Sequence, residues 1–240
     1  MNGTPYRFVL TLTTVMMLMT FRLHANPILP GGTVAPDIFP DIGPVPLLNQ
    51  TTGTFSFGSG IGLITGTYTE EVAVDPFGVT CPGCLDFAYW VSLDAGLSAG
   101  IFHLTMGRFF GYSTDVGYVA GTGHVGGSGG DGTPILVQRG PFGGGLGFVF
   151  VSPSAGAAIG PGGDSAILVV ATDSKTYDSR GFLGISGGRL GSPANGQIMG
   201  LFEPTLQAPV PEPSSVALLI LGLAGIAVFS RKRRSKRQFV

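Results

Sequence analysis

The pattern that most constrains this chain is a series of short apolar stretches whose side chains alternate with a period of two. The stretch LDFAYWVSL puts five large side chains on one face of an extended strand: Leu85, Phe87, Tyr89, Val91 and Leu93. Similar runs, bounded by Gly, Pro, Ser or Asp, are IFHLTM, VGYVA, PILVQR, LGFVFV, SAILVVATD, GFLGI and QIMGLF. The pattern predicts roughly ten short strands with no helices between them.

Glycine and proline support the same interpretation. The 240 residues include 41 Gly and 18 Pro without a G-X-Y period, which excludes collagen. Helix interiors tolerate neither residue, whereas turns between short strands use both. Parallel sheets need crossover helices, so we predict an all-β domain over residues 47–209, a two-sheet antiparallel sandwich with a jelly-roll-like arrangement.

The amino-terminal segment, residues 1–25, has the three parts of a signal peptide. Arg7 is the basic start, residues 8–21 are apolar, and Leu23-His24-Ala25 suggests cleavage after Ala25. The apolar part is shorter than the ~20 residues that cross a bilayer, so we expect export rather than a buried helix or an anchor. Residues 26–46 contain six prolines and predict a linker or an irregular arm against the domain edge.

Charge is unevenly distributed along the chain. The whole sequence has a net charge of −1, but residues 26–213 carry five cations and all fourteen carboxylates, a net charge of −9. Nucleic acid is attracted to basic surfaces, so this composition argues against a nucleic-acid partner.

Three features follow one another at the carboxyl end: the motif VPEPSS at 210–215, an apolar stretch at 216–230, and residues 231–240 with six cations. As a helix, residues 216–230 cover about 22 Å, less than the ~30 Å hydrocarbon core, although flanking Lys and Arg can snorkel. We predict a transmembrane helix with its basic end in the cytoplasm and the β domain outside. An ordinary carboxyl-terminal anchor is the alternative interpretation.

These residues resemble the PEP-CTERM sorting signal of Gram-negative bacteria, which is recognised by exosortase, a membrane-embedded Cys-dependent transpeptidase-like enzyme. The resemblance is carried by the sorting motif Val210, Pro211, Glu212, Pro213 and Ser214 and by the basic stop Arg231, Lys232, Arg233 and Arg234. It implies exosortase as the partner and an inner-membrane-anchored precursor. It also implies cleavage near Pro-Glu-Pro and transfer to the cell surface or to the exopolysaccharide matrix of a biofilm. CLDFAYWVSL and FFGYSTDVGYVAG are similar to the β-rich bodies of such exported proteins, which implies a fold but no activity.

Cys81 and Cys84 form the sequence CPGC. Outside the cytoplasm two thiols at this spacing favour a local disulfide. A thioredoxin-like site is the alternative, but it places a helix after the first thiol, whereas LDFAYWVSL predicts a strand. A zinc site would need further ligands.

Two glycine-rich motifs resemble ligand-binding loops. GTGHVG, residues 121–126, matches the dinucleotide pattern G-x-G-x-x-G, but the following GSGGDGTP cannot begin the helix that holds the pyrophosphate. GGSGGD, residues 126–131, matches the start of a calcium-binding nonapeptide, which needs stacked repeats to complete its ligand shell. Asp131 is therefore a weak calcium candidate, and we predict no metal site and no cofactor.

Ser128 and Ser186 each lie in the pattern G-x-S-x-G. A hydrolase of that class has its His after the Ser in the chain, and the only histidines are His24, His103 and His124. Other triad orders exist, but we interpret His103 as a strand residue and His124 as a loop residue.

A glycosidase would need two carboxylates that face each other about 5–9.5 Å apart. The candidates lie in separate parts of the sequence: Glu70, Glu71, Asp94, Asp115, Asp131 and Asp164. We therefore predict a protein that is not an enzyme and has a structural or adhesive role. The alternative is an extracellular carbohydrate-binding module that stacks aromatics such as Trp90 on sugars, or a glycan hydrolase.

Overall fold

The computed structural model describes residues 26–39, 46–75, 80–96, 99–119, 132–150, 159–189 and 191–205. These residues form two sheets, as the sequence predicted, and one short 3-10 turn, η1 (Gly60–Gly62). Sheet A consists of β1 (Asn26–Pro27), β3 (Asp37–Phe39), β4 (Leu47–Phe57), β5 (Ile64–Val74), β6 (Leu85–Leu93), β8 (Thr114–Val119) and β11 (Ile167–Thr172). Sheet B consists of β2 (Thr33–Val34), β7 (Gly100–Gly107), β9 (Leu136–Arg139), β10 (Gly145–Val149), β12 (Tyr177–Arg189) and β13 (Ser192–Pro204).

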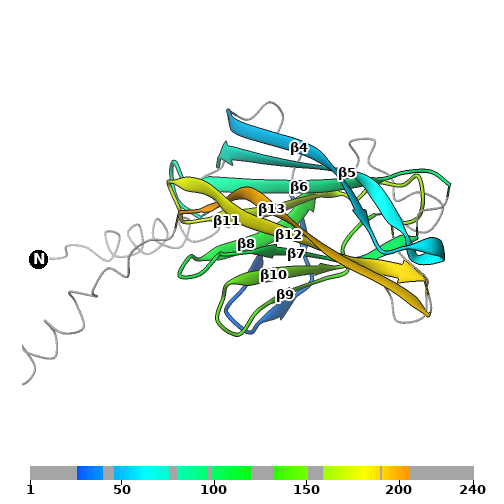
Figure 1. Ribbon diagram of the computed structural model, residues 1–240. Coiled ribbons are helices and arrows are strands. Elements are labelled where there is room, and N and C mark those ends of the chain that lie inside the picture. Colours follow the sequence, from blue (N-terminus) through cyan, green and yellow to red (C-terminus); the bar gives the residue numbers. More distant parts are fainter. Residues whose placement is uncertain are drawn as a thin grey trace, which may run out of the picture. The chain divides into compact units, whose positions relative to one another are not determined.

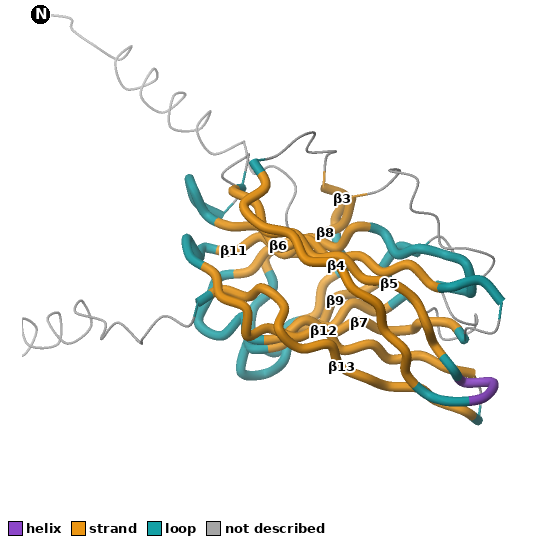
Figure 2. The backbone as a smooth tube through the Cα atoms, turned by 45° about the horizontal axis from the view of Figure 1, so that its top comes forward, coloured by secondary structure: helices purple, strands orange, loops and turns teal. Residues whose placement is uncertain are grey.

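The two sheets lie as two layers (Figures 1 and 2). Sheet A has the order β1-β8-β11-β6-β5-β4, and sheet B has the order β13-β12-β7-β10-β9-β2. Strand β3 pairs with β8 in parallel, and the other pairings between named strands are antiparallel. Three pairs are nested in the chain: β9 with β10, β8 with β11, and β7 with β12. Successive pairs lie in alternate sheets: β9–β10 in sheet B, β8–β11 in sheet A and β7–β12 in sheet B. The segment from β7 to β12 thus resembles one long hairpin that folds over both layers.

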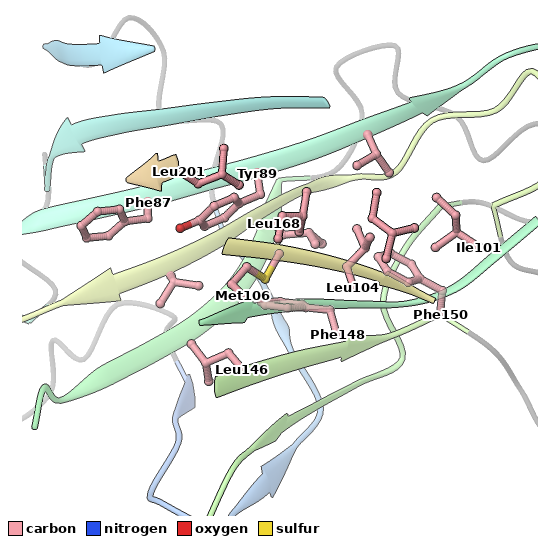
Figure 3. Packing of buried hydrophobic residues seen from close by; sticks show 14 of the residues in the cluster. Phe87, Tyr89, Ile101, Leu104, Met106, Leu146, Phe148, Phe150, Leu168 and Leu201 are labelled. Carbon is pink, nitrogen blue, oxygen red and sulfur yellow. The ribbon is translucent and has the colours of Figure 1, made fainter. Parts of the chain in front are cut away.

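The core lies between the layers and is built by the predicted alternation. The five side chains predicted to share one face of β6 are all buried, and none is more than 5% exposed. They pack with side chains of sheet B such as Leu104, Met106 and Phe148 in one hydrophobic cluster (Figure 3). Strand β6 itself has the bounds of the stretch LDFAYWVSL.

Glycines inside the strands have a packing role. Several of them lie under an aromatic ring that a Cβ atom would displace, for example Gly107 under Phe182 and Gly196 under Phe57. Rings that cover glycines in this way restore the apolar contact that a missing side chain gives up. The high glycine content is therefore compatible with long, regular strands.

Residues 26–46, predicted as a linker or arm, are in part integrated into both sheets. Strands β1 and β3 pair with β8, β2 pairs with β9, and the side chains of Ile28 and Phe39 are buried. The prolines alternate with residues free to donate hydrogen bonds, so two- and three-residue strands form at sheet edges where proline is tolerated. The described sandwich thus begins at Asn26, before the boundary at Leu47 that the sequence predicted.

Two methionines provide a matched test of this core. Met106 is fully buried between the sheets, whereas Met199 on β13 is 62% exposed. We expect Met106→Ala to lower the free energy of unfolding by about 2–5 kcal/mol through lost burial and a cavity. Met199→Ala should change it by about 0.5 kcal/mol or less. Urea denaturation measures both, and equal effects would contradict the packing described.

Candidate functional site

Three β-turns lie side by side at the end of the sandwich where the described chain begins and ends. They are Leu29–Gly32 (LPGG), Phe109–Tyr112 (FFGY) and Gly140–Gly143 (GPFG). Each is closed by a backbone hydrogen bond from its fourth N–H to its first carbonyl, at 2.8, 3.4 and 2.8 Å respectively. Gly31 and Gly111, the third residues of their turns, have φ of 75° and 79°, which a residue with a side chain adopts at a cost. We call these three turns the three-turn tip.

The Arg139 side chain joins the three turns from beneath. It is 5% exposed, and its guanidinium donates to the carbonyl oxygens of Ile28 (2.8 Å), Phe109 (3.0 Å), Tyr112 (2.7 Å) and Gly143 (3.1 Å). Burial lowers the pKa of Arg139, and the charge of Asp173 acts in the opposite direction. The planar fork of five donors suits this role, because one side chain satisfies carbonyls from three separate segments.

The tip carries large apolar side chains on its outside. Leu29 is 76% exposed, Phe142 is 85% exposed and Phe110 is 48% exposed. The turns contact one another directly: Gly31 N–H donates to Gly140 O at 3.0 Å. The Phe110 ring lies over Gly144, where it would be 2.0 Å from a Cβ atom. A depression of about 520 Å³ adjoins the tip and is lined by Ile28, Leu29, Tyr112, Asp115 and Arg139 among others.

Replacing Arg139 tests its structural role. Arg139→Met removes the shared donor of four carbonyls, of which Ile28 O and Phe109 O keep a second, longer hydrogen bond, and we expect the free energy of unfolding to fall by about 2–4 kcal/mol. Arg139→Lys should recover only part of the loss, because an ammonium lacks the planar fork. The exposed Arg189 provides the control, since Arg189→Met should have little effect in the same urea titration.

A second polar cluster, which we call the β13 clasp, fastens the last strand to sheet A. Phe202 N–H donates to Glu70 Oε2 at 2.7 Å, and Tyr89 O–H donates to Phe202 O at 3.2 Å. Glu203 Oε1 accepts from Arg108 Nη1 at 3.3 Å. Glu70 and Tyr89 are opposite each other on β5 and β6, so two inward side chains of sheet A hold one peptide of sheet B.

The two carboxyl groups of the β13 clasp have raised pKa values. Both residues are fully buried, and neither Glu70 Oε1 nor Glu203 Oε2 has a hydrogen-bond partner among the described residues. Burial raises the pKa of Glu70 to about 8, with a smaller contribution from the Glu203 charge. Burial raises the pKa of Glu203 to about 7, although Arg108 opposes the shift. Near neutral pH the pair therefore retains protons that exposed glutamates have lost.

The end of β13, which precedes the sorting motif in the sequence, is fixed to the sandwich. Tyr112 O–H donates to Thr205 O, and Thr205 N–H donates to Thr176 O at 3.1 Å. Thr205 is the last described residue, and Val210 follows five residues later. The three-turn tip also includes Tyr112, so the tip and the exit of the strand share one end of the sandwich.

The raised pKa values predict a pH dependence with a definite sign. Between pH 4.5 and about 8, folded Glu70 keeps a proton that the unfolded chain has lost, so stability falls as pH rises through this window. We expect Glu70 to contribute roughly 3–5 kcal/mol to the loss between pH 4.5 and pH 8.5. Glu70→Gln should remove that contribution, because a neutral amide can still accept from Phe202 N–H.

Glu71→Gln, on the opposite face of the same strand, is the control and should leave most of the pH dependence in place. Stability measured by urea denaturation at four or five pH values distinguishes the variants. A wild-type protein that gains stability up to pH 8.5 would contradict the proposed protonation.

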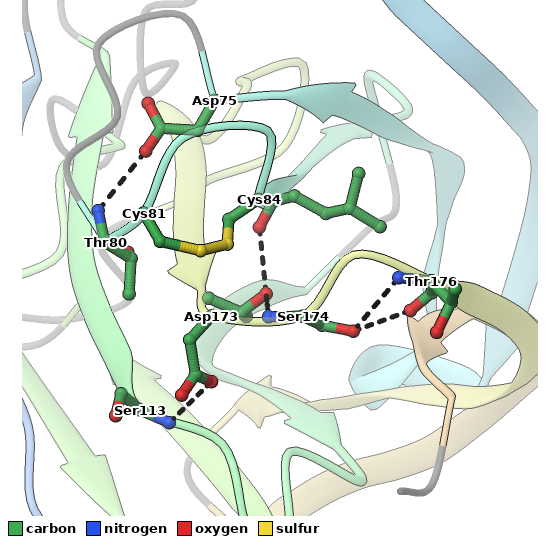
Figure 4. The surroundings of a disulfide bond; sticks show 10 residues. Asp75, Thr80, Cys81, Cys84, Ser113, Asp173, Ser174 and Thr176 are labelled. Carbon is green, nitrogen blue, oxygen red and sulfur yellow. Dashed lines mark hydrogen bonds between the residues drawn. A yellow bond between two sulfur atoms is a disulfide. The ribbon is translucent and has the colours of Figure 1, made fainter.

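Cys81 and Cys84 form a disulfide in the structure (Figure 4). The CPGC turn is closed by Cys84 N–H donating to Cys81 O at 3.1 Å, and Gly83 has a φ of 73°. Strand β6 follows immediately, so the helix of a thioredoxin-like site does not follow these cysteines. The turn lies beside Thr172–Ser174, where Thr172 Oγ1 donates to Leu85 O at 2.9 Å.

Asp86 is a buried carboxyl on the outer face of sheet A, between Ala73 and Ala171 on the neighbouring strands. Its Oδ1 has no hydrogen-bond partner among the described residues. Burial, and then the charges of Asp75 and Asp115, raise its pKa to about 8. Within the described ranges, no group of three or more His, Cys, Asp or Glu residues has an arrangement that could hold a metal ion.

The residues that the sequence suggested for catalysis lie in different parts of the sandwich. Glu70 points inward while Glu71 accepts from Gln50 Nε2 on the outer side at 3.1 Å, and Asp115 lies at the tip end. Asp94 and Asp164 lie at the other end, near the bridge between Ser92 and Asp164. Of the described candidates, Glu70 and Glu71 therefore point to opposite faces of β5, and Asp115 lies at the other end of the sandwich from Asp94 and Asp164.

Ser186 and His103 occupy paired positions on β12 and β7. His103 Nδ1 is 3.4 Å from Thr105 Oγ1, and burial lowers the pKa of His103. Both residues lie within strands, so Ser186 is not on the strand-to-helix turn that activates the G-x-S-x-G nucleophile.

Several predicted sites lie outside the described residues. These are residues 121–126, Ser128 and Asp131, the sorting motif Val210–Ser214, the predicted helix 216–230 and the basic stop Arg231–Arg234. Within the described part, no helix is long and apolar enough to cross a membrane.

Sequence reasoning missed Arg139, Arg108 and Glu203. One feature of the sequence could have pointed to Arg139. It is one of only five cations between residues 26 and 213, and it lies two residues after Val137, so both side chains are on the same, buried face of a strand. Glu203 had none, since its partners are Arg108, which directly follows β7, and Glu70 on β5, both far away in the chain.

Comparison with known proteins identifies one part of the chain. Residues 209–234 match the family model of the PEP-CTERM protein-sorting motif. No curated protein and no solved structure matches the chain. The chain therefore carries a PEP-CTERM sorting motif behind a strand-rich body, as the sequence predicted, and the motif implies export, exosortase-dependent sorting to the cell surface and a membrane-anchored precursor.

Proposed function

We propose that the protein is a non-enzymatic surface protein, which exosortase cleaves at the Pro-Glu-Pro triplet and delivers to the cell surface or the exopolysaccharide matrix. The observation that carries the proposal is the sorting motif at residues 209–234. The two prolines of the Pro-Glu-Pro triplet lack amide hydrogens and disfavour a helix, which suits a segment that a processing enzyme has to reach.

A structural or adhesive role for the β domain is supported by the use of its polar groups. Arg139 and the two glutamates of the β13 clasp are buried. Arg139 donates to backbone carbonyls, Glu70 accepts from a backbone N–H, and Glu203 accepts from Arg108. These groups hold turns and strands of the sandwich together. Because they are buried, they are poorly placed to reach a soluble substrate.

Intact-mass measurement tests the processing step. In cells with exosortase, we expect the mature protein to lack the residues that follow the cleavage point near Pro211–Pro213. In cells without exosortase, and for the variant Pro211→Ala/Pro213→Ala in cells that have it, Val240 should remain attached. Val240 present in every sample would refute processing, and its loss in every sample would assign cleavage to another protease.

A further inference from the structure

The three-turn tip exposes an apolar surface that the fold does not use. Leu29 and Phe142 are among the most exposed large apolar residues; Leu29 is the first residue of its turn and Phe142 is the third residue of its turn. Single exposed apolar residues are common on proteins, but a contiguous group is typical of an interaction surface. The three turns are neighbours here, because Gly31 N–H donates to Gly140 O, the Phe110 ring lies over Gly144, and Arg139 joins the three backbones.

The tip is also held in one conformation. Its turns are closed by their own hydrogen bonds, and each is bonded to Arg139 directly or through the preceding residue. A surface that is already ordered loses little conformational entropy when it binds. Leu29 and Phe142 are thus displayed at fixed places, and Phe110, which is 48% exposed, is fixed by lying over Gly144.

The place of the tip in the chain indicates its partner. Tyr112 of the tip bonds to Thr205, and ten residues, 206–215, separate Thr205 from the predicted helix at 216–230. An extended chain of this length reaches at most roughly 40 Å. While the helix anchors the precursor, the tip is therefore kept close to the bilayer, and this tether raises the effective concentration of even weakly binding groups.

The other end of the sandwich is farther from this tether. It carries η1, purple in Figure 2, with Ile61 67% exposed. Strand β5 begins near η1 and ends next to the residues of the disulfide turn, so the two ends are separated by an 11-residue strand. Of these two apolar sites, the tip is the one that the tether favours.

We propose that the three-turn tip is a membrane-contact surface, in which Leu29, Phe110 and Phe142 enter the boundary between lipid headgroups and acyl chains while the precursor is anchored. This inference rests on the membrane-anchored precursor of the proposed function. Because residues 26–213 are acidic, the contact depends on apolar side chains, and zwitterionic lipid is the expected surface.

Tryptophan fluorescence of the full-length chain in phosphatidylcholine vesicles tests the inference. Trp90 is replaced by Phe, and a reporter is introduced at the tip by Phe142→Trp or at the other end by Ile61→Trp. With brominated acyl chains, we expect about twofold quenching at position 142, because interfacial side chains lie about 5–10 Å into the boundary. Position 61 should be quenched far less.

A second variant separates apolar contact from mere proximity. Leu29→Ser/Phe110→Ser in the Phe142→Trp background should reduce quenching at position 142, whereas Met199→Ser in that background should not. Leu29 is exposed, whereas Phe110 is half-exposed and covers Gly144, so the double variant should have a slightly lower melting temperature and remain folded. The melting temperature is measured for every variant, including Trp90→Phe.

Flotation of the vesicles distinguishes the two proposals. A chain that floats but shows no preferential quenching at position 142 overturns the tip contact and leaves the anchor intact. A chain that does not float overturns the anchored precursor and the tip contact with it. A blue shift of the emission from the tryptophan at position 142 that grows with protein concentration, without quenching by brominated lipid, would indicate self-association through the tip. That result would also overturn the inference.

Discussion

The guanidinium of Arg139 is the contact on which one whole end of the sandwich depends. Edge strand β2 and the turns around β7, β9 and β10 all end within its reach, and their carbonyls point at a single buried side chain. Backbone carbonyls removed from water need donors, and an apolar residue in this place could not supply them. Without Arg139 the turns would have no common partner, although the hydrophobic core between the sheets would remain.

The β13 clasp solves a related problem by a different route. β13 is an edge strand of sheet B with one paired neighbour, β12, yet it is the strand that continues toward the sorting motif. Glu70 and Tyr89 hold its peptide from the opposite sheet. A protonated carboxyl does this at lower cost than an ionised one, because it can be buried without a full charge.

Features that depend on local periodicity were predictable, and features that depend on distant contacts were not. The alternation of Leu85–Leu93 predicted β6 and its inward face correctly. The same period places Glu70 inward on β5, but its partner Phe202 is 132 residues away and no local pattern links them. The strands at 26–39 were missed because their prolines were interpreted as breakers, whereas short pairings at a sheet edge accommodate them. The sorting motif could be identified from the sequence alone, because its three parts follow one another in the chain.

The nested strand pairs have a consequence for when the domain can fold. Of the three nested pairs, only β9 with β10 joins neighbouring strands, while β8 must wait for β11 and β7 must wait for β12. Contacts of such long range make folding slow, because loops must close before any pairing is gained. Outside these pairs, β4, β5 and β6 pair in chain order, and so do β12 and β13. A chain delivered through a membrane from its amino end thus emerges with β4, β5 and β6 able to pair at once, while β7 and β8 wait for β12 and β11. The sandwich can close only after β12 (Tyr177–Arg189) has crossed the membrane. Most of the chain therefore crosses before the complete fold can form.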